Sequence, residues 1–232
     1  MAHLVIISDL HLGQSFALDP FSSFLHDLRK RVRPDLLILN GDIFELAWFK
    51  WSELESQVLF RDSLDELRDF ASSIETVLIP GNHDPRNKLL PDKLLPIRIV
   101  SYDAQLGEVI ALDNIIFTHG HQFDMTTHLW DSLLKLPIRT LLPPLYLKLY
   151  GTPYQLKSAQ KEKDYHELAF WVTGRAALHA VRAGKYLIFG HTHLPLQIEL
   201  ESGLKVINCG DWRDSLSFVE VQDREIKLKF WR

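Results

Sequence analysis

The sequence of 232 residues contains a single cysteine, Cys209. One cysteine cannot form a disulfide within the chain, and such scarcity is typical of proteins from a reducing compartment. The 26 Lys and Arg residues are fewer than the 30 Asp and Glu residues, which gives a formal net charge of −4. A general nucleic-acid binder is expected to carry excess positive charge. We therefore expect no nucleic-acid partner.

Long uncharged apolar runs are also missing. The longest apolar stretch, residues 129–150, includes Asp131, Lys135, Arg139, Lys148 and three prolines, so it does not predict a transmembrane helix. The first residues, MAHLVIISDL, lack the basic segment and the small-residue cleavage site of a signal peptide. These absences predict a cytoplasmic protein. The apolar share of 46% is enough to build a substantial core.

Short runs of leucine and β-branched residues recur through the first 80 residues, and each run ends in polar residues. The runs lie at residues 4–8, 35–40 and 76–80, separated by stretches with helical spacing of apolar residues. Alternating strands and helices predict βαβ units and a largely parallel sheet. In such a sheet, ligands bind at the carboxyl ends of the strands, so polar residues there are candidates for a site.

The pattern changes in the second part of the chain. Residues 108–121 are typical of a β-hairpin whose second strand also ends in polar residues. Residues 126–182 have mostly helical spacing, and successive strands with Gly and Asp turns follow them. We therefore expect an α/β core of two sheets that is interrupted by a helical insertion.

Five polar clusters follow apolar strands: SDLHLG (8–13), NGD (40–42), GNHD (81–84), THGH (118–121) and GHTH (190–193). The candidate metal ligands within them are Asp9, His11, Asp42, Asn82, His119, His191 and His193. Oxygen and imidazole ligands without thiolate suit Mn, Fe, Co, Ni or Zn. Seven ligands are too many for one such ion but suit two ions that share a carboxylate.

The ordered set D-x-H, G-D, G-N-H-D, H and G-H-x-H resembles the calcineurin-like metallophosphoesterase superfamily, over residues 9–193. The resemblance implies a four-layer αββα sandwich of two mixed sheets, forming a single domain over residues 1–232 with a helical lid at about 126–182. It implies hydrolysis of a phosphoester by a metal-bound hydroxide at a binuclear centre, with manganese the favoured metal. Asp42 would bridge both ions. Asp9, His11 and His193 would complete one site, and Asn82, His119 and His191 the other; His121 is an alternative to His119.

His83 would stand beside the metals and protonate the leaving oxygen or stabilise its charge. A histidine in this role needs an orienting carboxylate. Asp84 is adjacent, but neighbouring side chains at a turn usually diverge. In superfamily members with GD-x-x-D, the acid three residues after the bridging Asp pairs with this histidine, and Glu45 holds that position here. We therefore favour Glu45 over Asp84.

GDIFELAW (41–48) and the late GDW (210–212) resemble the UDP-2,3-diacylglucosamine diphosphatases of lipid A biosynthesis, which also carry a helical lid before GHTH. This resemblance implies a lipid-linked sugar-nucleotide diphosphate as substrate and a peripheral membrane contact through the lid. His83 departs from it, because these enzymes usually have Arg in a GNRD motif. The predicted substrate contacts are Asn82, His83, His121, Lys157 and Lys161, with Lys163 nearby.

Other interpretations of the same residues remain open. A nucleotide phosphodiesterase or a phosphoprotein phosphatase would share the metal ligands but need an open cleft, and the helical insertion would then be only a cap. A non-catalytic interaction scaffold would belong to another class of protein. A scaffold is expected to have lost metal ligands, whereas this chain keeps all seven, so we favour an enzyme.

Overall fold

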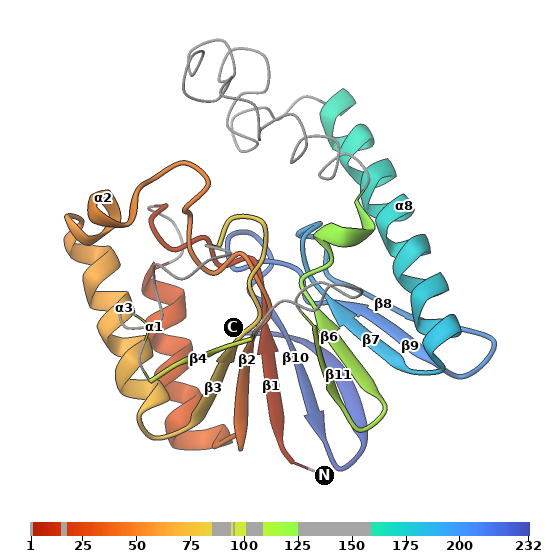
Figure 1. Ribbon diagram of the computed structural model, residues 1–232, viewed down its shortest axis with the longest axis horizontal. Helices are drawn as coiled ribbons and strands as arrows, with labels where there is room; N and C mark the ends of the chain where they lie inside the picture. The colour runs from red at the N-terminus through yellow and green to blue at the C-terminus, as the bar shows by residue number, and fades with distance from the viewer. Residues whose placement is uncertain (1, 15–17, 85–93, 95, 101–108, 125–158) are drawn as a thin grey trace.

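The computed structural model describes residues 2–14, 18–84, 94, 96–100, 109–124 and 159–232. Two β-sheets pack face to face, and helices cover the outer face of each sheet (Figure 1). None of the helices within these residues combines the length and the hydropathy that a bilayer-spanning segment requires.

The first sheet has the strand order β11-β10-β1-β2-β3-β4. Its strands are β1 (Leu4–Ile7), β2 (Leu36–Leu39), β3 (Glu75–Leu78), β4 (Arg98–Ile99), β10 (Ser217–Gln222) and β11 (Glu225–Phe230). β1 to β4 pair in parallel, whereas β10 and β11 form an antiparallel hairpin on the other side of β1. The three predicted N-terminal strands are therefore confirmed, but the sheet is mixed because the chain returns to it at its C-terminal end.

The second sheet has the order β5-β6-β7-β9-β8. Its strands are β5 (Val109–Leu112), β6 (Ile115–Thr118), β7 (Tyr186–Phe189), β8 (Leu196–Glu199) and β9 (Lys205–Asn208). β5 and β6 form the predicted hairpin, and β6, β7 and β9 pair in parallel. β8 pairs antiparallel with β9 at the far edge.

The helices follow from the apolar spacing. α1 (Leu18–Asp27), the π-helix η1 (Leu28–Val32), α2 (Trp51–Glu55) and α3 (Val58–Ala71) lie along the first part of the chain, and the 3-10 turn η2 (His121–Phe123) and α8 (Ala159–Ala183) lie further along. α1 and α3 cover the first sheet, and α8 covers the second (Figure 1). α3 buries Phe60, Leu64 and Leu67, which recur at helical spacing, so one face of the helix packs on the core.

Alternation along β1 divides the core into layers. Val5 and Ile7 pack against the helices, whereas Leu4 and Ile6 pack between the sheets with residues such as Phe117. This is the period of two that a strand covered on both faces requires. On the far side of the second sheet, residues of α8 form a third apolar cluster with β6, β7 and β9. The predicted αββα sandwich of two mixed sheets is thus confirmed.

The helical insertion is only partly within the described residues. α8 accounts for the C-terminal part of the predicted segment 126–182 and is helical as expected. Residues 125–158 lie outside the described part of the chain, so the lid stays a prediction.

Candidate metal centre

The predicted metal ligands lie on loops that follow the carboxyl ends of five parallel strands, at one end of the two sheets (Figure 1). Asp9 and His11 follow β1, Asp42 follows β2, Asn82 follows β3, His119 follows β6, and His191 and His193 follow β7. Because parallel strands end at the same edge, residues far apart in sequence converge there.

Six of these residues form two compact groups. The first holds Asp9, His11 and His193, and the second holds Asp42, His119 and His191. In each group, one potential ligand atom per residue lies within 4.8 Å of the others. A further group joins His11, Asp42 and His83, so Asp42 stands where the two groups meet. Each of the two groups could hold one ion, with Asp42 between them.

The backbone of the site is held in an unfavourable conformation. Five of the predicted ligands have positive φ: Asp9 (55°), His11 (48°), Asp42 (53°), His191 (72°) and His193 (51°). Non-glycine residues rarely adopt this left-handed region, and such residues gather at functional sites where the surrounding structure holds them in place. The strain therefore points to this loop cluster as the functional end of the fold.

Two motif glycines let the loops approach each other. A Cβ on Gly81 would overlap the carboxylate of Asp42, and a Cβ on Gly190 would overlap the side chains of Ser8 and Asp9. Glycine is required at both positions because no other residue leaves this space free.

The carboxylates of Asp9 and Asp42 each use one oxygen to accept hydrogen bonds from neighbouring groups. Oδ2 of Asp9 accepts hydrogen bonds from Oγ of Ser8 (2.5 Å) and the backbone N–H of His191 (2.9 Å). Oδ1 of Asp42 accepts a hydrogen bond from the backbone N–H of His83 (2.7 Å). The second oxygen of each carboxylate faces the histidines: Oδ1 of Asp9 lies 3.3 Å from Nε2 of His193, and Oδ2 of Asp42 lies 3.1 Å from Nε2 of His119.

Several polar atoms at the centre are buried and lack a hydrogen-bond partner within the described residues. They include Oδ1 of Asn82, and also Oδ1 of Asp9 and Nε2 of His119, whose neighbours at 3.3 and 3.1 Å are themselves side chains of predicted ligands. A buried polar atom without a partner is costly, and a metal ion would satisfy these atoms. The residues present therefore fit a pair of divalent cations.

Each of the four histidines among the predicted ligands has an acceptor near one ring nitrogen, and in three of them the acceptor lies within hydrogen-bond distance. Nδ1 of His11 lies 2.8 Å from Oε2 of Glu45, and Nδ1 of His119 lies 3.1 Å from the carbonyl oxygen of Asn40. Nε2 of His191 lies 3.0 Å from Oδ2 of Asp124. Nδ1 of His193 lies 3.6 Å from Oδ2 of Asp211. Acceptors of this kind set the tautomer of a metal-binding histidine and raise its basicity.

Glu45 lies between two of the functional histidines. It is fully buried, and while Oε2 engages His11, Oε1 lies 2.6 Å from Nδ1 of His83. The rings of His11 and His83 meet edge to face with centroids 4.9 Å apart. One carboxylate thus orients both a predicted ligand and the predicted proton donor.

Asp84 has a different environment. Its carboxylate accepts hydrogen bonds from the backbone N–H groups of Ile43, Phe44 and Gly81, at 3.3, 2.8 and 3.0 Å. It therefore ties the loop after β3 to the loop after β2. Burial, together with the nearby charge of Asp42, raises the pKa of Asp84 to about 6.

Charges at the site perturb one another strongly. Burial alone would lower the pKa of His83, but the carboxylates of Asp42 and Glu45 raise it to about 9. Burial alone would raise the pKa of Glu45, but its hydrogen bonds with His11 and His83 lower it to about 2. In the metal-free protein, His83 is therefore protonated at neutral pH and paired with an ionised Glu45.

The other predicted substrate contacts differ in how far the structure places them. His121 is buried in η2, with its ring centroid 5.5 Å from that of His119, and it belongs to none of the ligand groups. Lys157 lies outside the described residues, and Lys161 and Lys163 lie on α8 with side chains outside the described part. Their roles stay predictions.

Sequence reasoning did not assign roles to Asp124 and Asp211, the acceptors of His191 and His193. Asp211 lies in the GDW motif, which was used only as part of the family resemblance. Its carboxylate also accepts hydrogen bonds from Ser215. Asp124 follows THGH by three residues, and this proximity was its only signal in the sequence.

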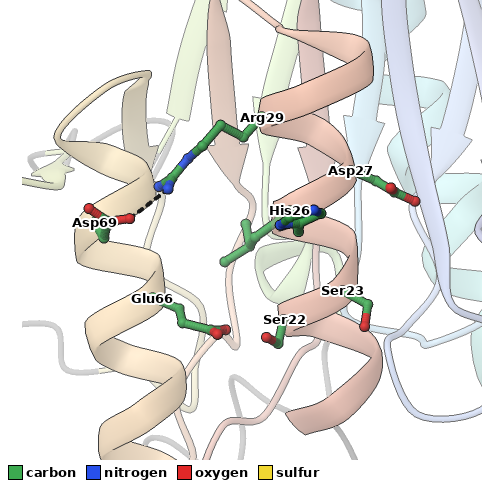
Figure 2. Close-up of a pocket in the computed structure, with 8 residues that line it drawn as sticks. Ser22, Ser23, His26, Asp27, Arg29, Glu66 and Asp69 are labelled. Carbon is green, nitrogen blue, oxygen red and sulfur yellow. Dashed lines mark hydrogen bonds and ion pairs between the residues drawn. The ribbon is translucent and has the colours of Figure 1, made fainter.

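A surface cavity of about 440 Å³ lies away from this centre, between α1 and α3 (Figure 2). Its lining residues are Ser22, Ser23, Leu25, His26, Asp27, Arg29, Glu66 and Asp69. Arg29 crosses it to pair with Asp69 at 2.6 Å. It belongs to the outer helical layer and contains none of the predicted site residues.

Comparison with known proteins agrees with this geometry. A family model described as calcineurin-like phosphoesterase matches residues 2–195. A protein named UDP-2,3-diacylglucosamine hydrolase from Shewanella sp. is 27% identical over 240 residues, covering 97% of this chain and 95% of that protein. A DNA polymerase II small subunit from Halobacterium salinarum is 23% identical, covering 93% of this chain and 44% of that protein. A dimetal phosphatase from Danio rerio shares the fold, with a TM-score of 0.54 and 14% identity over 99% of this chain and 95% of that chain.

The family match covers most of the chain and includes every predicted metal ligand. It accounts for the two sheets, the converging loops and the paired groups of acid and histidine side chains. The chain belongs to the calcineurin-like phosphoesterase family and is a metal-dependent phosphoester hydrolase.

Proposed function

We propose that this enzyme cleaves the diphosphate of a lipid-linked sugar nucleotide of the UDP-2,3-diacylglucosamine type, at a centre of two divalent ions, with manganese as the favoured metal. The observation that carries the two-metal part is the pair of ligand groups that meet at Asp42. The substrate class is supported by the near full-length similarity to proteins named UDP-2,3-diacylglucosamine hydrolase.

In this proposal, Asp9, His11 and His193 would hold one ion, Asn82, His119 and His191 would hold the other, and Asp42 would be the ligand that they share. Bound divalent ions would polarise the phosphoryl oxygens and supply a nucleophile at neutral pH. The chain itself orients this chemistry. Glu45, Asn40, Asp124 and Asp211 hold the histidine rings, and the backbone N–H of His83 holds the bridging carboxylate.

His83 is the proposed proton donor to the leaving phosphate. Its Nδ1–H donates to Glu45, so Nε2 is the nitrogen that is free to deliver a proton. Its ring is 19% exposed, whereas Glu45 is fully buried, so the histidine faces the approach of the substrate and the carboxylate does not. In the metal-free protein, the carboxylates of Asp42 and Glu45 raise the pKa of His83 to about 9, so the ring carries a proton that it can donate, and its charge favours a diphosphate.

Exposed aromatic side chains on α8 favour the proposal of a lipid-linked substrate. Phe170 and Trp171 on α8 are 72% and 60% exposed, and their rings contact each other at a centroid distance of 6.0 Å. Exposed neighbouring aromatic side chains suit contact with acyl chains or with the interfacial region of a membrane. A substrate with two acyl chains resides at a membrane surface, so we expect the enzyme to work at its cytoplasmic face.

A panel of substrates tests the proposal. The Mn-loaded enzyme is assayed with UDP-2,3-diacylglucosamine, its deacylated analogue, a dinucleotide and a phosphopeptide. We expect the acylated substrate to react far faster than the deacylated one, because each buried CH₂ contributes about 0.8 kcal/mol of binding energy. Equal rates for the two would remove the lipid-linked assignment. Faster hydrolysis of the dinucleotide or the phosphopeptide would replace it with a nucleotide phosphodiesterase or a phosphoprotein phosphatase.

A pair of surface variants sharpens this test. Replacing Phe170 and Trp171 with Ser should lower activity on the acylated substrate and leave hydrolysis of p-nitrophenyl phosphoesters unchanged. The matched control replaces Val58 and Leu59, which are 58% and 56% exposed on α3, with Ser. The control should change neither activity. A loss on both substrates in the Phe170 and Trp171 variant would count against a lipid contact at this face.

A further inference from the structure

The four ligand histidines do not present the same nitrogen to the centre. In His11, His119 and His193, Nδ1 faces an acceptor, so Nε2 is the atom that faces the other ligands. His191 is the exception, because its Nε2 lies 3.0 Å from Oδ2 of Asp124. Only its Nδ1 remains for the centre.

Asp124 lies behind His191 and not among the ligands. Although its carboxylate contacts His191, Asp124 belongs to none of the three groups in which ligand atoms approach within 4.8 Å. Asp124 is 4% exposed, so its charge is largely removed from water. A buried carboxylate is expensive unless a donor satisfies it, and the ring N–H of His191 is such a donor.

The backbone that carries Asp124 is fixed by the second helical layer. The residue follows η2, and its N–H donates to the carbonyl oxygen of His121 at 3.1 Å. Nη1 of Arg175 on α8 donates to the carbonyl oxygen of Phe123 at 3.1 Å, and the Phe123 ring lies 5.6 Å from that of His179. Asp124 is thus held on a scaffold that is separate from the loop of His191.

We propose that Asp124 is a positioning residue that holds His191 in the Nε2–H tautomer, with Nδ1 directed at the ion shared by Asp42, Asn82 and His119. This inference rests on the proposed two-metal function and extends it to a residue outside the ligand set. Glu45 and Asp211 serve His11 and His193 in the other half of the centre, so the loss of Asp124 affects one half only. Carboxylates in this position contribute about 10- to 100-fold to metal affinity.

The tautomer can be read in the metal-free protein, independently of activity. Long-range ¹⁵N–¹H NMR correlations of the wild-type apoprotein at pH 8 should show His191 protonated on Nε2 and unprotonated on Nδ1. In Asp124→Ala, the His191 signals should move towards a mixture of tautomers, while those of His119 stay in place. A wild-type His191 protonated on Nδ1 would overturn the proposal.

Metal binding then measures what this positioning contributes. Mn²⁺ titrations by calorimetry should show that Asp124→Ala weakens one of two sites by about 10- to 100-fold and leaves the other at wild-type affinity. Asp124→Asn keeps an acceptor oxygen and should restore part of the loss. Asp113→Asn, in the β5–β6 turn, is the matched control and should bind as the wild type does.

The outcomes separate this inference from the proposed function. If the wild type binds two ions and Asp124→Ala binds both with unchanged affinity, Asp124 has no positioning role. Equal weakening of both sites in a folded variant would also reject it. If the wild type itself binds fewer than two ions, the binuclear centre fails, whereas the NMR result still decides how Asp124 acts on His191.

Discussion

The two sheets supply chemically different halves of the candidate centre. Loops of the first sheet provide every predicted oxygen ligand, Asp9, Asp42 and Asn82, together with His11. Loops of the second sheet provide only histidines. In the proposed centre, the first sheet would therefore contribute the negative charge and the bridging carboxylate, and the second sheet would contribute imidazole ligands. Neither sheet alone supplies the seven predicted ligands of two divalent cations.

The two halves are also held in opposite ways. Donors fix the carboxylates of the first sheet, as Ser8 and the N–H of His191 do for Asp9. Acceptors fix the histidines of the second sheet, as the Asn40 carbonyl does for His119. Some of these contacts cross between the sheets, because His191 and Asp9, or Asn40 and His119, come from different ones. The site is therefore complete only when the two sheets are packed together.

The largest effect is expected from removing Asp42, the proposed bridge between the two ions. Asp42→Ala should remove the shared ligand and lower phosphoesterase activity by at least about 10³-fold, since several kcal/mol of transition-state stabilisation depend on the ions. Metal content measured after Mn saturation should fall together with activity on p-nitrophenyl esters. A variant that keeps both ions and near wild-type activity would show that Asp42 is not the bridge.

The next effect concerns proton transfer and not metal binding. His83→Ala should keep both ions but lose activity by about 10²- to 10⁴-fold. The loss should be smaller for esters with good leaving groups, such as p-nitrophenolate, because they need no proton. Rate ratios across a series of leaving groups measure this. The same loss for good and poor leaving groups would reject the acid role and leave His83 as a positioning or electrostatic residue.

Glu45→Gln should produce a mixed defect, because Glu45 holds a ligand of one half and the proton donor at once. We expect a smaller activity loss than for His83→Ala, together with weaker binding of one ion. Asp84→Asn is the informative comparison, since the hydrogen bonds that the structure shows for the Asp84 carboxylate within the described residues come from backbone N–H groups. A defect in Asp84→Asn larger than that of Glu45→Gln would assign the orienting role to Asp84.

The pairing of Glu45 with His83 predicts how the stability of the metal-free protein depends on pH. The pKa of Glu45 falls from 4.5 to about 2 on folding, so its stabilisation is present above pH 4.5 and is lost as the pH falls towards 2. The pKa of His83 rises from 6.5 to about 9, so its stabilisation is present below pH 6.5 and is lost as the pH rises through 9. Denaturant titrations of the apoprotein should show both decreases, and Glu45→Gln should flatten the acid side. An unchanged acid side in the variant would contradict the pairing.

The smallest effect is expected at Cys209, which follows β9 in the second sheet. The residue is fully buried, and burial together with the charge of Asp9 raises the pKa of its thiol. Thiolate is the reactive form, so iodoacetamide should not label the native protein at neutral pH but should label it in denaturant. Rapid labelling of the native state would show that the end of β9 is more open than the structure indicates.

Sequence patterns predicted the parts of the molecule that depend on local order. The strands before each cluster and the hairpin at 108–121 followed from apolar periodicity. The ligand set stays a prediction, and it came from motifs that the structure places after parallel strands. The return of β10 and β11 to the first sheet was not predicted, because no local pattern states which strand a late hairpin joins.

The acceptors behind the histidines were harder to foresee. Asp124 and Asp211 act at a distance in sequence from His191 and His193, so only the packing of α8, η2 and the strand ends reveals their contacts. Glu45 could be chosen because the family pattern gave its position, but its second contact with His11 depended on the fold. Residue types in the loops were enough to predict the candidate ligands. The acceptors that other elements of the fold place behind them could not be predicted in the same way.

The number of ions per chain tests the central claim most directly. Protein of confirmed integrity would be stripped of metal, saturated with Mn²⁺, freed of excess metal and analysed for metal and protein content. Two groups of ligands that meet at Asp42 predict two ions per chain. One ion per chain at saturation would contradict a centre in which the acidic loops of one sheet and the histidine loops of the other share two metals.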